Sequence, residues 1–257
     1  MENHSTANIP KSNESQINKN ESPNIKYLKV SSFYNFTLEV KGNTIFQNLI
    51  LTARATNSNN EQIPMSYRWN RVTKNTQIMV KGANTFSYIP TASDFGYFIQ
   101  VIATPLQNPE EISSAIYGPV LMTDDVKKAL EVLLTVGQSF FSCAFYDTKR
   151  QQKIANKEAR IYLDNETIKM TEVNANNESL IEDFKYSSLG PAIWLNPCNS
   201  NHFIIRFFEL SQSNDGSNNM NKTVRAEYNL LAMSKQSREL IYLLVRFFLI
   251  DEYLKNN

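Results

Sequence analysis

Hydrophobic and polar residues alternate along the first part of the chain, from Tyr27 to about Met122. This period of two predicts β-strands with one buried face, and no helical period interrupts it. Polar segments such as Asn57–Asn60 and the Lys81–Ala83 turn separate the strands. The segment therefore predicts a β-sandwich. The alternating apolar positions of one strand are Leu49, Leu51, Ala53 and Ala55. Tyr67, Trp69 and Arg71 share the face expected to be the core, and Ile99, Val101 and Ala103 are expected to face inward.

A corner follows the strand that carries Trp69, the residue expected to fill the space between the two sheets. Pro90 fixes a backbone angle there, Asp94 offers local hydrogen bonds, and Gly96 permits a conformation that other residues avoid. A lone Asp beside a Gly also fits a metal or catalytic carboxylate. No second carboxylate or His lies at ligand spacing, so the structural interpretation is favoured. The corner signature comprises Trp69, Gly82, Tyr88, Pro90, Asp94 and Gly96.

The second part of the chain begins with Thr123 as a helix N-cap, followed by two acidic residues that favour the positive end of the helix dipole. A short helix is predicted over 126–135, with Val126, Leu130, Leu133 and Leu134 on its buried side. Strands are predicted over 139–146, 160–163, 167–170, 181–186, 202–208 and 223–232, with a polar loop over 213–221. Ser234 then caps a final amphipathic helix. Its apolar stripe comprises Leu240, Leu243, Leu244, Phe247, Phe248 and Leu254.

Composition excludes several classes of protein. The formal net charge is +1 over 257 residues, so no global field recruits nucleic acid. The first 25 residues are rich in Asn and Ser and poor in apolar residues, which predicts a disordered tail. No apolar leader is recognised at the N-terminus, and the run Leu240–Ile250 is too short to span a bilayer. Cys143 and Cys198 match no metal or redox spacing, so a buried thiol and a loop thiol are expected. These features favour a cytoplasmic protein without a transmembrane segment.

One basic cluster is a candidate binding site. It comprises Lys149, Arg150, Lys153, Lys157 and Arg160, and it is expected in a loop between two strands. Basic side chains from adjacent strands suit phosphate oxygens, as in anionic lipid headgroups. A protein contact, such as an acidic tubulin tail, and a merely solvated hairpin remain alternatives.

No pattern indicates catalysis, a cofactor or a metal. Two histidines in separate segments make no triad or ligand set, and His202 is expected to be an ordinary strand residue. No Gly-rich phosphate loop occurs. The aromatic residues of the second part suit hydrophobic packing better than a platform for nucleic acid, although Phe207 or Phe208 remains an alternative cover for an inter-domain surface. They are Phe140, Phe141, Phe145, Tyr146, Phe203, Phe207 and Phe208.

The corner motif Tyr88-x-Pro90-Thr91 and Asp94-x-Gly96, with Trp69 and Gly82, resembles the immunoglobulin-like repeat of the "auxin-induced in root cultures nine" family. These are large microtubule-associated proteins of plants and some protists. The segment 227–247 resembles the last strand and helix of the pleckstrin-homology-like domain that ends the same family.

After the tail predicted over 1–25, the resemblance implies an immunoglobulin-like sandwich over 26–122 and a pleckstrin-homology-like domain over 123–257. The linker near Thr123 is short, so the two domains are expected to pack as one rigid unit. The resemblance also implies a non-enzymatic scaffold of the cytoskeleton or cell cortex. The expected partners are tubulin or cortical proteins. Peripheral binding to phosphoinositides is the alternative. The family's leucine-rich and additional immunoglobulin-like repeats are absent from this sequence.

Overall fold

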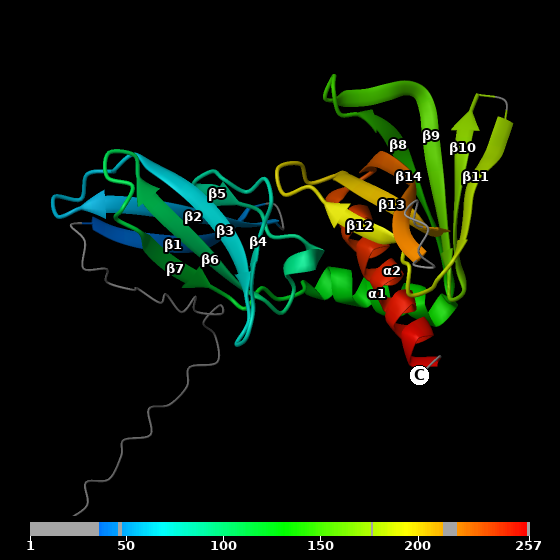
Figure 1. Cartoon of the computed structure of the whole chain (residues 1–257), viewed down its shortest axis with the longest axis horizontal. Coiled ribbons are helices and arrows are strands. Elements are labelled where there is room, and N and C mark those ends of the chain that lie inside the picture. The colour runs from blue at the N-terminus through cyan, green and yellow to red at the C-terminus, as the bar shows by residue number, and fades with distance from the viewer. Residues whose placement is uncertain (1–35, 46–47, 176, 213–219, 256–257) are drawn as a thin grey trace, which may run out of the picture.

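The computed structural model describes residues 36–45, 48–175, 177–212 and 220–255. Two β-rich units follow one another along the chain and lie end to end in Figure 1. The prediction of a mainly β fold with a C-terminal helix is confirmed. The predicted tail over 1–25 and most of the predicted loop over 213–221 lie outside the described residues.

Two antiparallel sheets form the first unit. The first has the order β1-β2-β5 and the second has the order β4-β3-β6-β7. A one-turn 3-10 helix, η1, spans Ala92–Asp94. The strands are β1 (Phe36–Ile45), β2 (Asn48–Asn57), β3 (Met65–Val72), β4 (Gln77–Met79), β5 (Ser87–Tyr88), β6 (Phe98–Pro105) and β7 (Ser113–Tyr117).

Trp69 lies at the centre of the first unit, and none of its surface is exposed. Its ring stacks on Tyr88 with centroids 5.5 Å apart, and its indole N–H donates to the Thr85 carbonyl at 2.8 Å. Because a buried indole N–H needs an acceptor, this bond fixes the ring as well as satisfying it. Both sheets contribute to the surrounding cluster, as the alternation predicts for Leu51, Ala53, Ala55, Ile99, Val101 and Ala103.

The corner is organised around the buried Asp94 carboxylate. It accepts hydrogen bonds from Arg71 Nε at 2.6 Å, from the Tyr88 hydroxyl at 2.7 Å and from the Thr91 backbone N–H at 2.6 Å. Burial alone would lower the pKa of Arg71, but the Asp94 carboxylate raises it above its usual value. Gly96 has a φ of 82°, which favours glycine. The carboxylate is thus fully engaged inside the chain.

Seven antiparallel strands form the sheet of the second unit, in the order β11-β10-β9-β8-β14-β13-β12. The helix α1 (Asp124–Val136) precedes the strands, and α2 (Lys235–Lys255) follows them. The strands are β8 (Gln138–Asp147), β9 (Gln152–Asp164), β10 (Thr167–Asn174), β11 (Asn177–Lys185), β12 (Ala192–Leu195), β13 (His202–Gln212) and β14 (Met220–Ala232).

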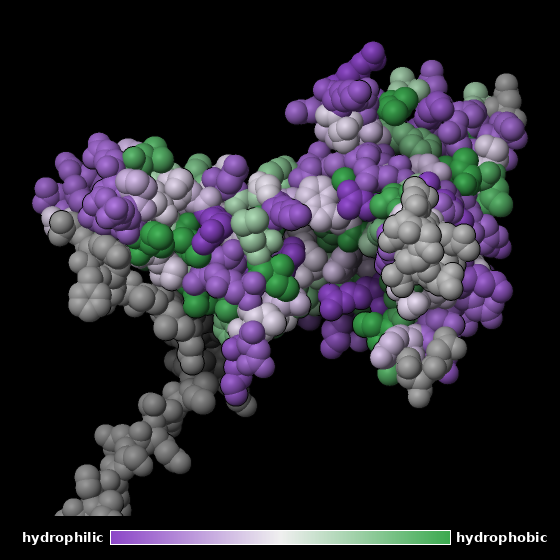
Figure 2. All heavy atoms as spheres, in the orientation of Figure 1, coloured by the Kyte–Doolittle hydropathy of each residue, from purple (hydrophilic) through white to green (hydrophobic). Residues whose placement is uncertain are grey.

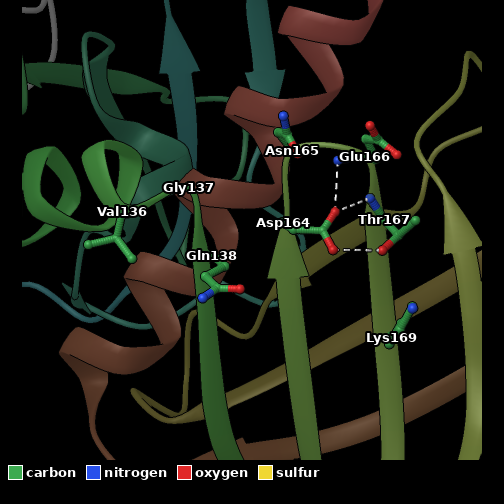
Figure 3. A pocket seen from close by; sticks show the side chains of 8 residues that line it. All are labelled: Val136, Gly137, Gln138, Asp164, Asn165, Glu166, Thr167 and Lys169. Carbon is green, nitrogen blue, oxygen red and sulfur yellow. Dashed lines mark hydrogen bonds between the residues drawn. The ribbon is translucent and has the colours of Figure 1, made fainter.

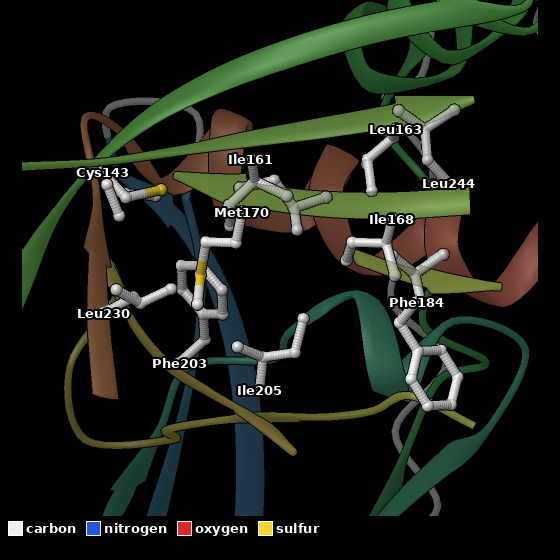
Figure 4. Packing of buried hydrophobic residues seen from close by; sticks show 14 of the residues in the cluster. Cys143, Ile161, Leu163, Ile168, Met170, Phe184, Phe203, Ile205, Leu230 and Leu244 are labelled. Atoms are coloured by element: carbon white, nitrogen blue, oxygen red, sulfur yellow. The ribbon is translucent and has the colours of Figure 1, made fainter. Parts of the chain in front are cut away.

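Both ends of this sheet contribute to one core. Figure 4 shows Ile161, Met170 and Phe184 from β9, β10 and β11 around the same space as Phe203 and Ile205 from β13. Helix α2 covers this core with Ile241, Leu244, Val245 and Phe248. The Ser237 N–H donates to Ser234 Oγ at 3.0 Å, so the predicted N-cap is confirmed. The predicted buried side of α1 is also confirmed.

The predicted stripe of α2 is wrong in part. Leu240, Leu244 and Phe248 are buried, whereas Phe247 and Leu254 are 47% and 69% exposed. The helix carries a second apolar strip on its outer side, and the three-and-four spacing does not tell which strip faces the core.

The burial of Phe140 differs from the prediction for the aromatic residues, whereas the two thiols agree with theirs. Phe203 and Phe207 are fully buried as expected, but Phe140 is 64% exposed on the outer face of β8, where its ring lies 6.1 Å from that of Tyr162. The thiols are free, Cys143 buried and Cys198 exposed, which confirms the prediction. Burial raises the pKa of Cys143 to about 12.

Replacing Asp94 with Asn should lower the free energy of unfolding by about 3–5 kcal/mol, because Arg71 loses its buried partner. Denaturant titration followed by tryptophan fluorescence measures the change. The matched control is Asp183→Asn, whose exposed carboxylate lies 3.7 Å from Lys169 and should contribute less than about 1 kcal/mol. Equal losses in both variants would contradict a structural role for the corner.

Candidate binding surfaces

The basic cluster is placed differently from the sequence prediction. Only Lys149 and Arg150 lie in the turn between β8 and β9, whereas Lys153, Lys157 and Arg160 lie within β9 itself. The predicted loop is wrong for Lys153 and Lys157 because β9 begins at Gln152, before them, whereas Arg160 lies in a strand as the predicted strand over 160–163 has it. Their side chains are spread along an exposed strand rather than gathered around one point.

Carboxylates accompany four of the five cations. Arg150 lies 3.7 Å from Asp147, and Lys153 lies 3.7 Å from Glu158. Among the described residues, no ion pair involves Lys149.

The remaining two cations pair with acidic residues of β10 and β11. Lys157 lies 3.1 Å from Glu172, and Arg160 lies 2.7 Å from Glu178. The hydrogen bond from Lys157 lowers the pKa of Glu172. The outer face of β9, β10 and β11 is therefore a network of opposite charges, and little net positive charge is available to an anionic ligand.

A buried ion pair lies between the two units. Arg238 and Glu239, at the start of α2, are 1% and 3% exposed, with Arg238 Nη2 2.6 Å from Glu239 Oε1. The other carboxylate oxygen of Glu239 accepts a hydrogen bond from the Ala92 N–H, at the start of η1 in the first unit. The pair thus connects α2 to the corner of the sandwich. We call these residues, Ala92, Arg238 and Glu239, the junction.

Arg238 also organises the segment that follows β12. Its Nη1 donates to the carbonyl oxygens of Asn196, Asn199 and His202 at 3.0, 2.7 and 3.3 Å. From the same segment, the Cys198 thiol donates to the Gly82 carbonyl of the first unit at 3.2 Å. This second inter-unit contact lies beside the first.

His202 begins β13, as predicted, but it is buried and accompanied by polar groups. Its Nδ1 lies 2.8 Å from Asn196 Nδ2, and its ring centroid lies 4.6 Å from that of Tyr146. Burial lowers its pKa, and the nearby Arg238 acts in the same direction. The imidazole is therefore neutral at pH 7, and it takes part in packing rather than in a charged site.

Two hollows are lined by polar groups that already form hydrogen bonds or ion pairs within the chain. One, of about 390 Å³, lies between the end of α1 and the β9–β10 turn (Figure 3). Its Asp164 carboxylate accepts from the N–H groups of Glu166 and Thr167 at 2.8 and 2.7 Å, which closes the turn. Burial alone would raise the pKa of Asp164, but these bonds bring it below its usual value.

The second polar hollow lies between β11 and β14 and measures about 550 Å³. Glu182, 8% exposed, binds Arg225 there and accepts from the Tyr228 hydroxyl at 2.9 Å. Burial, with the Glu182 contact adding to it, raises the pKa of Tyr228 to about 12. Because these groups satisfy one another, they stabilise this side of the sheet.

A third hollow, of about 700 Å³, has a mainly apolar lining and lies between the start of β12 and the last turns of α2. Leu189 and Pro191 come from the segment before β12, and Leu249 and Tyr253 come from α2. Its volume lies in the range of ligand sites. We call it the β12–α2 cavity. No sequence pattern predicted it, because β12 has only four residues and its pairing depends on distant segments.

A further hollow, of about 440 Å³, has Lys153, Asn199 and Leu231 in its lining. Figure 2 shows a mostly hydrophilic face with hydrophobic residues in small, separate groups. No helix among the described residues has the length and apolar character needed to cross a membrane. Within the same residues, no group of three or more His, Cys, Asp or Glu side chains is arranged to hold a metal ion. Comparison with protein-family models and with curated protein sequences gave no match.

Replacing Glu239 with Gln should lower the free energy of unfolding by about 3–5 kcal/mol, because Arg238 then stays buried without its counter-charge. Proteolysis of the connection at residues 121–123 should also become faster. The control is Glu227→Gln, which removes an exposed pair with Arg206 and should contribute less than about 1 kcal/mol. Identical unfolding and proteolysis of the two variants would show that the junction does not hold the units together.

The charge network also makes the lipid alternative testable. Because carboxylates offset four of the five cations, we expect no more flotation with phosphoinositide vesicles than with neutral ones. Vesicle flotation of the full chain measures this. Phosphoinositide-dependent flotation that disappears in the triple variant Lys149→Glu, Arg150→Glu and Lys153→Glu would contradict the expectation and establish lipid binding.

Proposed function

We propose that this chain is a non-enzymatic scaffold of the cytoskeleton or cell cortex that acts through protein–protein contacts. The observation that carries the proposal is the junction, in which Glu239 binds the Ala92 N–H across the boundary between the units. A buried contact of this kind holds two binding surfaces at a fixed distance and angle. Fixed geometry lowers the entropic cost of engaging a large partner with both units.

The architecture supports the two domain types that the family resemblance implies. A three-stranded sheet facing a four-stranded one, with a buried Trp69 between them, fits an immunoglobulin-like sandwich. Seven antiparallel strands closed by a C-terminal helix fit a pleckstrin-homology-like domain. The order of the two along the chain also agrees with the end of the microtubule-associated family.

The proposed partners are tubulin or cortical proteins, and the proposed location is the cytoplasm. The mainly apolar β12–α2 cavity suits a protein partner. Phosphoinositide binding through Lys149, Arg150, Lys153, Lys157 and Arg160 stays a sequence prediction, and the carboxylates beside four of these residues do not favour it.

Cosedimentation tests the proposed function. The purified chain should pellet with assembled microtubules or with a cortical cytoskeleton fraction, and it should stay in solution without them. Glu239→Gln should weaken pelleting, because the two units no longer hold a fixed geometry, whereas Glu227→Gln should not. A chain that stays in solution with both preparations, and that is wholly soluble after cell fractionation, would contradict the proposal.

A further inference from the structure

Among the residues that the structure describes, strand β12 is an open edge of the seven-stranded sheet. It pairs with β13 on one side, and it is the last strand in the sheet order. The opposite edge, β11, carries several charges and a register shift against β10 between Met170 and Thr171. Charges and bulges protect an edge against adding another strand. The sequence of β12 is Ala-Ile-Trp-Leu, which has neither protection.

The hydrogen-bond pattern of β13 shows which groups of β12 are available. The Asn196 N–H donates to the His202 carbonyl at 3.1 Å, and these residues continue the β12–β13 register. In an antiparallel pair, bonded and non-bonded positions alternate. Two steps back along this register, Trp194 and Ile204 form a bonded pair. Ile193 falls at the position between, so its N–H and carbonyl point away from β13.

The other side of β13 agrees with this assignment. The Ala232 N–H donates to the Asn201 carbonyl at 3.0 Å, in register with the β13–β14 pairs. By the same alternation, Phe203 and Ile205 bond to β14, which leaves Ile204 to bond to β12. Two independent bonds therefore assign the backbone groups of Ile193 to the open edge.

Apolar groups flank this edge on both faces of the sheet. Trp194, on the outer face, is 40% exposed. Ile193, on the inner face, is half-buried against the core beside the β12–α2 cavity. The cavity lining contains one cation, Lys222, and one anion, Glu252. Lys222 Nζ lies 4.2 Å from the centre of the Phe208 ring. The lining of the cavity therefore has no net charge, and an uncharged peptide segment is complementary to it.

We propose that β12 binds an extended, uncharged peptide segment of a partner protein, which adds to the sheet as an eighth strand. The inference rests on the proposed function, because it names the kind of partner contact that the scaffold makes. The residue opposite Ile193 exchanges two backbone hydrogen bonds with it and directs a large apolar side chain toward the β12–α2 cavity. The next residue of the segment contacts Trp194, since successive side chains of a strand point to opposite faces.

A random-peptide display library, selected on the intact chain, tests the proposal. Enriched peptides should carry large apolar residues at alternate positions and few charges. Tyr253→Arg should weaken their binding at least about tenfold by placing a charge in the cavity. Leu254→Arg should leave binding unchanged, because Leu254 is 69% exposed and is not part of the lining. Both positions are exposed, so neither variant should impair folding.

Backbone chemistry provides a second measurement. N-methylation of an enriched peptide at every second residue should abolish binding, because the N–H groups of these residues face β12. N-methylation at the residues between them should not abolish it. Bound peptide should slow amide hydrogen exchange in the segment 190–196. No enrichment, a loss of binding without this alternation, or protection confined to another segment would overturn the proposal.

The oligomeric state and cosedimentation distinguish a partner peptide from a second copy of the chain and from the cytoskeletal function itself. Concentration-dependent dimerisation that Tyr253→Arg abolishes would overturn the proposal and assign the edge to a second copy of the chain. Absent peptide binding together with normal cosedimentation would overturn the peptide site alone. Peptide binding without cosedimentation would overturn the cytoskeletal function and leave the edge as a peptide site.

Discussion

The buried pair of Arg238 and Glu239 is the interaction that sets the arrangement of the two units. Removing two charges from water is costly, and the cost is offset only where both ions find good partners. Arg238 meets three carbonyl oxygens between the end of β12 and the start of β13, and Glu239 meets the Ala92 N–H at the corner of the sandwich. One pair therefore positions the start of α2, the end of β12 and the first unit together.

Much of the fold follows from local pattern. Strict alternation identified the strands around Trp69 and Val101 because each of them has one buried face. The same alternation occurs at Phe36, Leu38 and Val40 of β1, all buried, so the first strand could have been predicted in the same way. Ser234 marked the start of α2 because an N-cap acts within one turn.

The features that escaped prediction depend on distant parts of the chain. Glu239 and Ala92 are 147 positions apart, and no local pattern connects them. The outer strip of α2, with Phe247 and Leu254, has the same spacing as the buried one, so periodicity alone does not separate the two. The basic cluster was recognised as charge, but its neutralisation by Glu172 and Glu178 follows from strand pairing.

The two edges of the large sheet differ in a way that bears on function. The face next to β11 is covered with ion pairs, which add little stability but oppose association with another strand. At the other edge, β12 is uncharged and has an apolar cavity beside it. A short edge strand limits unspecific pairing, while a cavity favours a partner with the right side chain. The contrast favours selective rather than general pairing at the β12 edge.

The open edge and the junction are also physically connected. Asn196 directly follows β12, its carbonyl accepts from Arg238, and its side chain contacts His202. The end of β12 is therefore held by the same guanidinium whose partner Glu239 binds the first unit. A segment paired with β12 would have a set orientation relative to the sandwich, because each step between them is a direct hydrogen bond. The proposed scaffold function would depend on this property, since a partner held on one unit could then contact the other without reordering the chain.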